Sequence, residues 1–225
     1  MYIYATGVPS VTTTTGTVAW GKPIGTLASG DKFAAINTNG YSNISLSKGA
    51  DASDYTEAAA NTALQKFANP EEIDISFLIP VAGSVVAANA AITIAETRKD
   101  CVAFISPPYS HVTADTVTTF RNSLKSSSYA VMDNTWKYQY DKYNDVYRWV
   151  PLNGDIAGLC VRTDATRDPW FSPAGYNRGQ IKNCVKLYKN PNKTQRDTLY
   201  QLGINPVVTF PGEGTILFGD KTLLT

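Results

Sequence analysis

Hydrophobic and polar residues follow three different patterns along the chain. The first fifty residues are rich in Thr, Gly and Ser, and short β-prone runs at residues 2–5 and 41–46 predict strands. Apolar runs that alternate with amphipathic runs come next, and a part rich in tyrosine and tryptophan follows. We therefore expect an N-terminal segment at residues 1–70 that packs on an α/β core at residues 71–225.

The middle of the chain alternates runs typical of buried strands with runs typical of helices. The expected strands are residues 73–81, 101–105 and 129–132, and the expected helices are residues 85–99 and 113–126. A further helix is expected before them, because Asp54 and Glu57 have the spacing of a capping box and Asn69-Pro70 ends the alanine-rich run. Strands that alternate with helices indicate a parallel sheet with helices on its faces.

The third part begins with aromatic residues that alternate with polar ones. Two such runs, at residues 136–140 and 147–151, flank a polar turn and predict a β-hairpin. The alternation places Trp136, Tyr138 and Tyr140 on one face of this hairpin.

Two helices and a second hairpin are expected after the first hairpin. Asp155 is the expected cap of the first helix, and the second ends at Asn190-Pro191, resumes at Thr194 and stops at Gly203. The residues that the second helix would carry inward are Ile181, Cys184, Val185 and Tyr188. Residues 207–218 predict the second hairpin. The fold class is thus α/β, with a mixed, largely parallel sheet flanked by helices and with added β-hairpins.

Composition narrows the class of protein. The chain has 225 residues, of which 43% are hydrophobic and 17% charged, and this excludes wholesale disorder. Its formal net charge is +1, so no global field attracts nucleic acid and no nucleic-acid partner is expected. No run reaches the roughly 18 apolar residues of a membrane span, and the first residues lack a signal peptide, so a soluble cytoplasmic product without membrane insertion is expected. Cys101, Cys160 and Cys184 are expected to be reduced, buried thiols.

Residues suited to catalysis or cofactor binding are few. Residues 16–22 match the start of a phosphate-binding loop, but Pro23 stands where that motif has Ser or Thr and lacks the N–H that such loops use. His111 is the one histidine, and no GxSxG elbow places a catalytic serine. We expect no catalytic residue, no cofactor and no metal. The enzyme alternative requires a pocket with ionisable groups near Pro80 and Ser106-Pro107-Pro108, at the carboxyl ends of the strands.

Basic residues recur at helical spacing after residue 180. They are Lys182, Lys186, Lys189 and Lys193, with Arg178 before them and Arg196 after. On a helix they would form a stripe beside the apolar face. The stripe has two interpretations, a solvated face of the helix or a docking surface for an acidic neighbour.

The aromatic hairpin is the other candidate surface. Core packing is the default interpretation of its rings, but the chain's thirteen tyrosines also suit half-buried protein–protein contacts. The candidate subunit-interface residues of the two surfaces are Trp136, Tyr138, Tyr140, Arg148, Trp149, Arg178, Lys182, Lys186 and Lys189.

Several sequence blocks occur in an order that is typical of one protein family. They are Trp136-Lys137-Tyr138-Gln139-Tyr140, Arg148-Trp149-Val150-Pro151-Leu152, Asp155-Ile156-Ala157-Gly158-Leu159-Cys160, Ser172-Pro173-Ala174-Gly175-Tyr176-Asn177-Arg178-Gly179, Ile204-Asn205-Pro206-Val207 and Gly219-Asp220-Lys221-Thr222. Over about residues 71–222 the chain resembles the tail sheath protein of contractile-tailed bacteriophages. The ordered set of blocks is far more specific than any one of them.

The resemblance implies a structural subunit and not an enzyme. It implies identical copies in stacked hexameric rings around a tail tube protein, together with baseplate and tail terminator proteins. Contraction would be a rigid-body rearrangement of the subunits that drives the tube through the host envelope. The implied location is the tail of the virion, after assembly in the host cytoplasm.

The resemblance covers only part of the family's scheme. Sheath proteins of this type also carry arms, outer domains and a C-terminal domain, so we expect the chain to be a fragment or a shortened form. The sheath of a bacterial contractile injection device is an alternative of the same kind, and an α/β enzyme is an alternative of another class.

Overall fold

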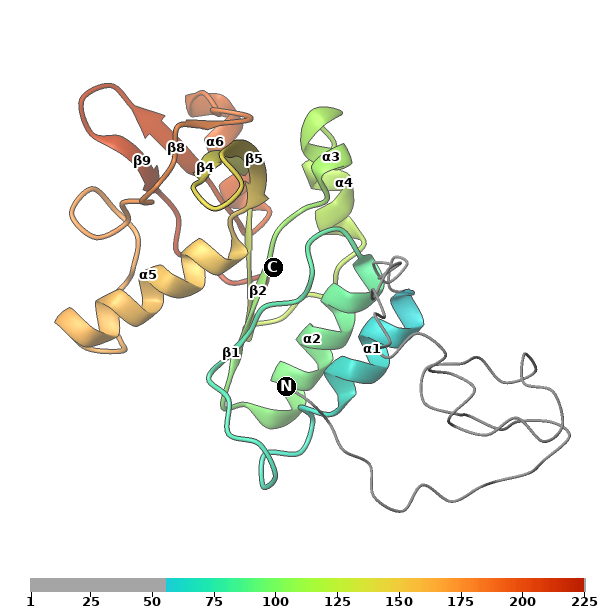
Figure 1. Cartoon of the computed structure of the whole chain (residues 1–225). Helices are drawn as coiled ribbons and strands as arrows, with labels where there is room; N and C mark the ends of the chain where they lie inside the picture. Colours follow the sequence, from blue (N-terminus) through green and yellow to red (C-terminus); the bar gives the residue numbers. More distant parts are fainter. Residues whose placement is uncertain (1–55, 225) are drawn as a thin grey trace, which may run out of the picture. The chain divides into compact units, whose positions relative to one another are not determined.

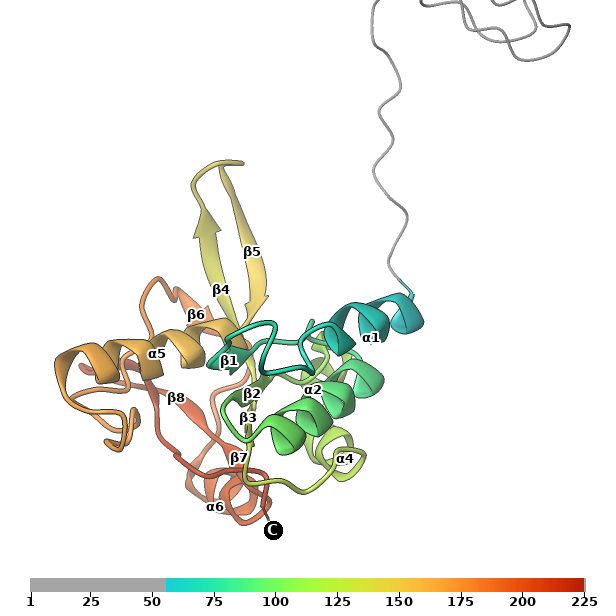
Figure 2. The ribbon, with the colours of Figure 1, turned by 90° about the horizontal axis from the view of Figure 1, so that it is seen from below.

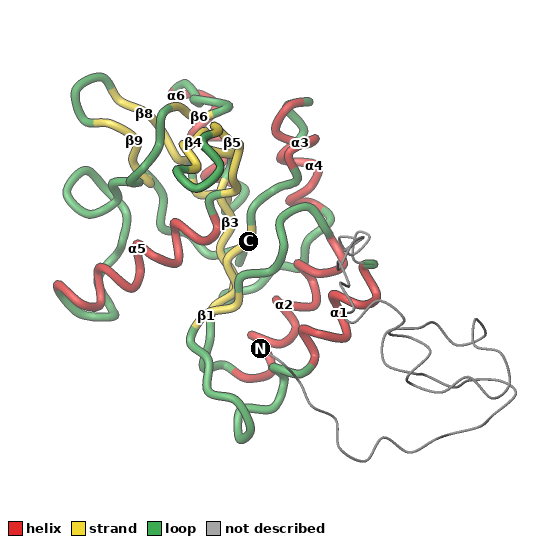
Figure 3. The backbone as a smooth tube through the Cα atoms, in the orientation of Figure 1, coloured by secondary structure: helices red, strands yellow, loops and turns green. Residues whose placement is uncertain are grey.

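Residues 56–224 are the part of the chain that the computed structural model describes, and they belong to one compact unit. They form a parallel sheet between helices, with β-hairpins added to it (Figures 1 and 3). The strands expected at residues 2–5 and 41–46, the glycine-rich run at residues 16–23 and the expected cap Asp54 lie outside the described residues. The division of the chain at residue 70 stays a prediction.

Four parallel strands form the central sheet within the described residues. In spatial order they are β1 (Phe77–Leu78), β2 (Val102–Ile105), β3 (Ala130–Asp133) and β7 (Ile204–Asn205). The three strands that the sequence predicts in the middle of the chain are confirmed, although β1 is much shorter than residues 73–81. The sequence pattern contains no signal for the short β7, which pairs with the end of β3.

Helices lie on both faces of this sheet (Figure 1). The helices α2 (Val85–Arg98), α3 (Tyr109–Thr113) and α4 (Val117–Asn122) cover one face, with α1 (Glu57–Gln65) packed on α2, and α5 (Asn153–Thr166) covers the other. Side-chain alternation along β2 creates the two layers, because Ala103 and Ile105 pack in the first core and Phe104 packs in the second. The predicted parallel sheet flanked by helices is thereby confirmed.

Helix boundaries differ from the sequence prediction at three places. The cap of α1 is Thr56, whose Oγ1 accepts a backbone N–H of the first turn at 3.2 Å. Asp155 does not cap α5, which begins at Asn153; it lies in the first turn, where a negative charge suits the helix dipole. The helix expected at residues 113–126 is instead the pair α3 and α4, because Asp115 between them takes a φ of 58°.

Antiparallel pairs form two smaller sheets beside the central one. The first predicted hairpin is confirmed as β4 (Trp136–Asp141) and β5 (Val146–Pro151), and β6 (Lys186–Leu187) adds to β4. The second is confirmed as β8 (Val207–Phe210) and β9 (Gly214–Leu217). The β4–β5 hairpin projects away from the sheet and helices (Figure 2).

The helix expected to begin near Ile181 does not form, and this prediction was wrong. The segment lies extended between two sheets: the Ile181 N–H donates to the Thr215 carbonyl and the Tyr188 N–H to the Trp136 carbonyl, both at 2.9 Å. Ile181 is buried, whereas Val185 is 60% exposed. Pairing with β9 and β4 satisfies the backbone groups and overrides the helical spacing of the apolar residues.

The helix expected to resume at Thr194 is confirmed as α6 (Lys193–Gln201). A capping box starts it: Asn192 Oδ1 accepts the Gln195 N–H at 2.9 Å, and Gln195 Oε1 accepts the Asn192 N–H at 3.0 Å. Its end also follows the prediction, because Gly203 takes a φ of 73° just beyond it.

Gly179 lies where the extended segment meets β9. A Cβ at this position would come within 2.6 Å of the Leu217 carbonyl oxygen and 2.8 Å of the Gly175 carbonyl oxygen. Both are backbone atoms, and the Leu217 N–H also donates to the Gly179 carbonyl at 2.7 Å. This close approach requires a residue without a side chain.

We predict that Gly179→Ala lowers the free energy of unfolding by about 1–3 kcal/mol, because the added methyl group overpacks against backbone. Gly158→Ala in α5 is the matched control, since a Cβ there meets no atom within 4 Å. It should stabilise the chain by up to about 1 kcal/mol, as is usual for Gly→Ala in a helix. Urea unfolding followed by circular dichroism measures both changes. Equal stability of the two variants would contradict the close approach at Gly179.

Candidate assembly surface

One face of the β4–β5 hairpin carries a cluster of aromatic rings. Tyr138 and Trp149 lie directly opposite each other on the two strands, with ring centroids 4.8 Å apart, and Tyr147 stacks on Tyr138 at 5.3 Å. The Lys186 ammonium lies 5.2 Å from the Tyr138 centroid and 5.8 Å from the Trp149 centroid, within the range of a cation–π interaction. We call Tyr138, Tyr147, Trp149 and Lys186 the hairpin face. The structure thus brings three predicted interface residues together.

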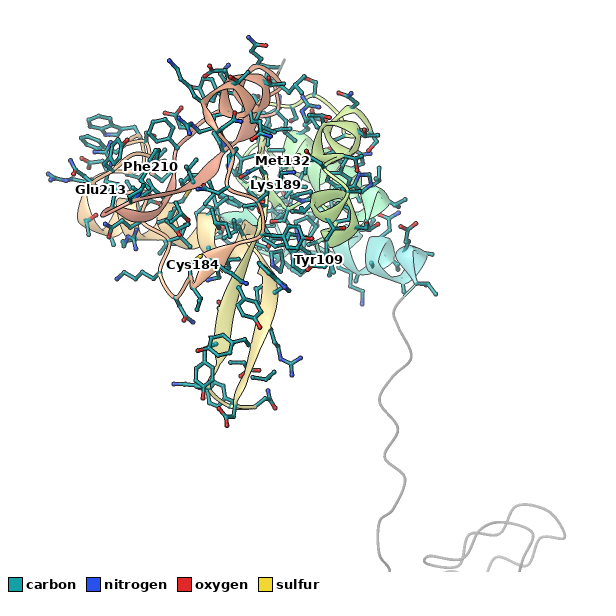
Figure 4. All side chains as sticks on the ribbon, turned by 90° about the horizontal axis from the view of Figure 1, so that it is seen from above. Tyr109, Met132, Cys184, Lys189, Phe210 and Glu213 are labelled. Carbon is teal, nitrogen blue, oxygen red and sulfur yellow. The ribbon has the colours of Figure 1, made fainter. Side chains whose placement is uncertain are left out.

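The base of the hairpin is fixed by rings from other elements. The Trp136 Nε1–H donates to the Pro107 carbonyl at 2.8 Å. Tyr109 of α3 meets Trp136 and Tyr188 edge to face, with centroids 5.2 and 5.4 Å away. Figure 4 shows Tyr109 where the hairpin leaves the body of the molecule. The sequence analysis assigned Tyr188 to the inward face of a helix and gave Tyr109 no role, because only the fold brings the two rings beside β4. The alternation that includes Trp149 could also have identified Tyr147.

The opposite face of the hairpin is anchored to α5 by a buried ion pair. The Lys137 side chain is 4% exposed, and its Nζ donates to Asp155 Oδ1 at 2.7 Å and to the Lys182 carbonyl at 3.3 Å. Burial raises the pKa of the Asp155 carboxyl, and the hydrogen bond and charge of Lys137 oppose this rise. One face of the hairpin is therefore held against the body while the ring-bearing face remains partly exposed.

Three of the other predicted interface residues lie apart from the hairpin face. Lys189 pairs with Asp115 at 2.8 Å. The Arg178 guanidinium donates to the Ser172 carbonyl at 2.8 Å. Lys182 is exposed. The predicted basic stripe does not form, because the segment is not helical and its lysines face different neighbours.

The two remaining predicted residues, Tyr140 and Arg148, lie toward the tip of the hairpin. The Tyr140 hydroxyl donates to Asp145 at 2.6 Å, and its ring lies 5.1 Å from that of Tyr147. Arg148 pairs with Asp141 at 3.2 Å, with 58% of its side chain exposed. An exposed ion pair of this kind stabilises little, so Arg148 remains available to a neighbour.

A buried hydrogen-bond network lies at the carboxyl ends of β2 and β3, where an enzyme with a parallel sheet would have its site. Ser106 Oγ donates to the Asp133 carboxyl group and accepts the N–H groups of Leu152 and Asn153 at 3.1 and 2.9 Å. Burial raises the pKa of Asp133 to about 8, against the opposing hydrogen bonds from Ser106 and the Thr135 N–H. Ser106 and Asp133 are at most 2% exposed, so the network joins elements and is closed to a substrate.

Three further features bear on a catalytic or metal site: His111, the groove beside Pro80, and groups of metal-ligating side chains. His111 Nδ1 lies 3.0 Å from the Thr116 carbonyl oxygen within the turn between α3 and α4. The groove beside Pro80 is lined by apolar side chains. Over residues 56–224, no three His, Cys, Asp or Glu side chains are grouped as a metal site would require. Within the same range, every helix is too short or too polar to span a membrane.

Comparison with known proteins identifies the family. A family model described as the phage tail sheath protein central domain matches residues 48–223. The chain belongs to the phage tail sheath protein family. The tail sheath protein of Vibrio phage KVP40 is 43% identical over 182 residues, and that of Enterobacteria phage T4 is 44% identical over 181 residues. These alignments cover 72% and 69% of this sheath chain but only 26% and 27% of the relatives, so it spans about a quarter of their length.

Solved structures share the sheath fold at lower sequence identity. The contracted sheath complex of an extracellular contractile injection system, PVC, matches with a TM-score of 0.60 at 19% identity, covering 73% of this chain and 44% of that one. The contracted helical sheath of the anti-feeding prophage matches with a TM-score of 0.50 at 16% identity, covering 66% and 39%. The tail sheath family is structural, so the alternative of an α/β enzyme falls away.

Removing the buried cation of the hairpin should destabilise the chain strongly. We predict that Lys137→Ala lowers the free energy of unfolding by about 3 kcal/mol, the lower end of the range for a broken buried pair, because Asp155 keeps some solvent contact. Lys142→Ala, at an exposed position of the same hairpin, should change it by less than about 0.5 kcal/mol. Adding Asp155→Ala to Lys137→Ala should restore part of the loss, and a fully additive loss in urea unfolding would contradict the pair.

The raised pKa of Asp133 predicts that the contribution of this residue to the free energy of unfolding falls as the pH rises from about 4 to about 8. In this range the unfolded chain loses the Asp133 proton near the ordinary pKa of 3.8, whereas the folded chain keeps it until about 8. The unfolded state then binds fewer protons, so the free energy of unfolding decreases with pH until both states are ionised. Asp133→Asn should flatten this part of the profile of urea midpoints against pH. Parallel profiles for the two proteins would disprove the assignment.

Proposed function

We propose that the chain forms the central part of a contractile tail sheath subunit, whose copies polymerise around a tail tube and contract by moving as rigid bodies. The observation that carries the proposal is the family match over residues 48–223. Because the chain spans about a quarter of the curated relatives, we assign it a limited share of the whole protein's work. That share is to provide a stiff body that presents contact surfaces to neighbouring copies.

The hairpin face is the contact surface that we propose first, together with Tyr140 on the same face and with Arg148, which lies on the opposite face toward the tip. Half-exposed Tyr and Trp rings match the composition of protein–protein interfaces, which are enriched in both residues. The buried anchor of Lys137 supports this role, because a surface held in place loses less conformational freedom on binding. The candidates Trp136, Arg178 and Lys189 bind partners inside the chain, so we propose that they support the surface from behind.

The partners that we propose for this chain are those that the family resemblance implies. We propose other copies in stacked hexameric rings, a tail tube protein, and baseplate and tail terminator proteins. The proposed location is the virion tail, after assembly in the host cytoplasm. Sequence identity favours a phage tail over an injection device, because three phage tail sheath proteins share 38–44% of residues with the chain and two injection-system sheaths share 16–19%.

A chimeric sheath protein tests the proposal. Residues 56–223 of this chain replace the matching central segment of the T4 tail sheath protein, and circular dichroism confirms that the chimera folds. Negative-stain electron microscopy should then show helical tubes of sheath dimensions. A folded chimera that remains as single subunits under conditions in which the T4 protein forms tubes would contradict the proposed function.

The same chimera tests the hairpin face. Lys186→Glu should shorten the tubes or abolish them, because the reversed charge faces two rings that favour a cation. Lys193→Glu is the matched control, since Lys193 is exposed at the start of α6, where an acidic residue suits the helix dipole. Tubes that respond equally to the two reversals would rule out a specific role for the hairpin face.

A further inference from the structure

The tip of the β4–β5 hairpin presents apolar side chains that the described part of the chain leaves uncovered. Tyr143 is 87% exposed, and Val146 and Tyr147 are 39% and 49% exposed. The Lys142 ammonium lies 5.0 Å from the Tyr143 ring centroid. A projecting aromatic residue on a hairpin whose base is fixed is a typical anchor for a protein partner.

A groove of matching character lies between α1 and the loop that follows β1. Its main lining residues are Ala60, Ala63, Leu64, Phe67, Ile79 and Val81. Its volume is about 350 Å³, which exceeds the roughly 150 Å³ that accommodates a benzene ring. Ile79 and Val81 are 50% and 54% exposed, so the lip of the groove is apolar and open to a partner.

An acidic side chain, that of Glu57, lies near this groove. Glu57 begins α1, and its carboxylate accepts the Ser84 hydroxyl at 3.0 Å. Ser84 caps α2, and Ala87 in the first turn of α2 lines the groove. Glu57 therefore lies close to the groove, as Lys142 lies beside Tyr143 at the hairpin tip. The two features are complementary in charge as well as in apolar character.

We propose that the hairpin tip of one copy docks in the α1 groove of a second copy, with Tyr143 as the anchor and Lys142 facing Glu57. The second copy is the favoured occupant because the sheath relatives assemble, and the inference rests on the proposed function in this respect. The tip and α1 lie apart on one copy in two views (Figures 2 and 4), so the contact joins different surfaces head to tail. Contacts of this type build rings or open helices.

Self-association of the full chain, measured by sedimentation velocity over a range of concentrations, tests the anchor. Tyr143→Ala should weaken association at least about tenfold, as expected for an aromatic hot spot. Trp170→Ala is the matched control, because Trp170 is 77% exposed on a loop remote in sequence from both surfaces. An equal effect of the two variants would overturn the inference.

Charge reversal tests the pairing of the two surfaces. Lys142→Glu and Glu57→Lys should each weaken association, and the double variant should recover most of it, because each new charge then meets its opposite on the neighbouring copy. A double variant that associates no better than the weaker single variant would overturn the proposed pairing.

Ala63→Glu distinguishes a second copy from another segment of the same chain. Ala63 is exposed in α1, so the variant should weaken association and leave the thermal midpoint unchanged. A lowered midpoint with unchanged association would place a segment of the same chain in the groove and overturn the inference. If the parent chain associates and Tyr143→Ala and Ala63→Glu both match the Trp170→Ala control, the proposed contact is contradicted but the proposed function is not. If the parent chain and the T4 chimera both stay monomeric, the proposed contact and the proposed function are both contradicted.

Discussion

The buried hydrogen bond between Ser106 and Asp133 belongs to a network that joins the ends of β2 and β3 to the start of α5, where the projecting hairpin leaves the body. The Ser106 hydroxyl accepts two N–H groups at the start of α5, which have no partner inside the helix, and donates to the end of β3. β4 begins three residues after β3 ends, and β5 ends just before α5. Both strands of the projecting hairpin therefore leave from this junction. Loss of either side chain would leave buried groups without hydrogen bonds.

A second buried polar side chain, Arg121, lies toward the opposite end of the parallel strands and joins several elements by hydrogen bonds. Arg121 is 5% exposed and donates to the carbonyl oxygens of Leu202 at 3.0 Å and Leu223 at 2.8 Å. Leu223 is fully buried, and its N–H donates to the Ala130 carbonyl at 2.8 Å. One guanidinium thus joins α4, the end of α6 and the last described residues, with hydrogen bonds that offset the burial of its charge.

The local sequence pattern predicts an element correctly where its buried residues recur with the period of the helix or strand that the backbone hydrogen bonds form. β2, α2 and both hairpins are of this kind. The pattern misled at Ile181 and Val185, because partners distant in sequence decide the backbone pairing there. Lys186 lies at the candidate site because β6 pairs with β4, and not because it belongs to a helical stripe of lysines. The ion pair of Lys137 with Asp155 carries no local signal, since it depends on how the hairpin meets α5.

The way in which β4 is held constrains how any assembly of this chain can change. Lys137 ties one face of β4 to α5, and Trp136 ties its start to the loop after β2. The direction of the hairpin is therefore set by the core, and a close-packed core resists continuous deformation. In the proposed assembly, a change of contacts between copies would therefore move this unit as a whole, and the free-energy difference between two arrangements would lie in the contacts between copies. The net charge of +1 would keep long-range repulsion between copies of this chain small in the proposed assembly.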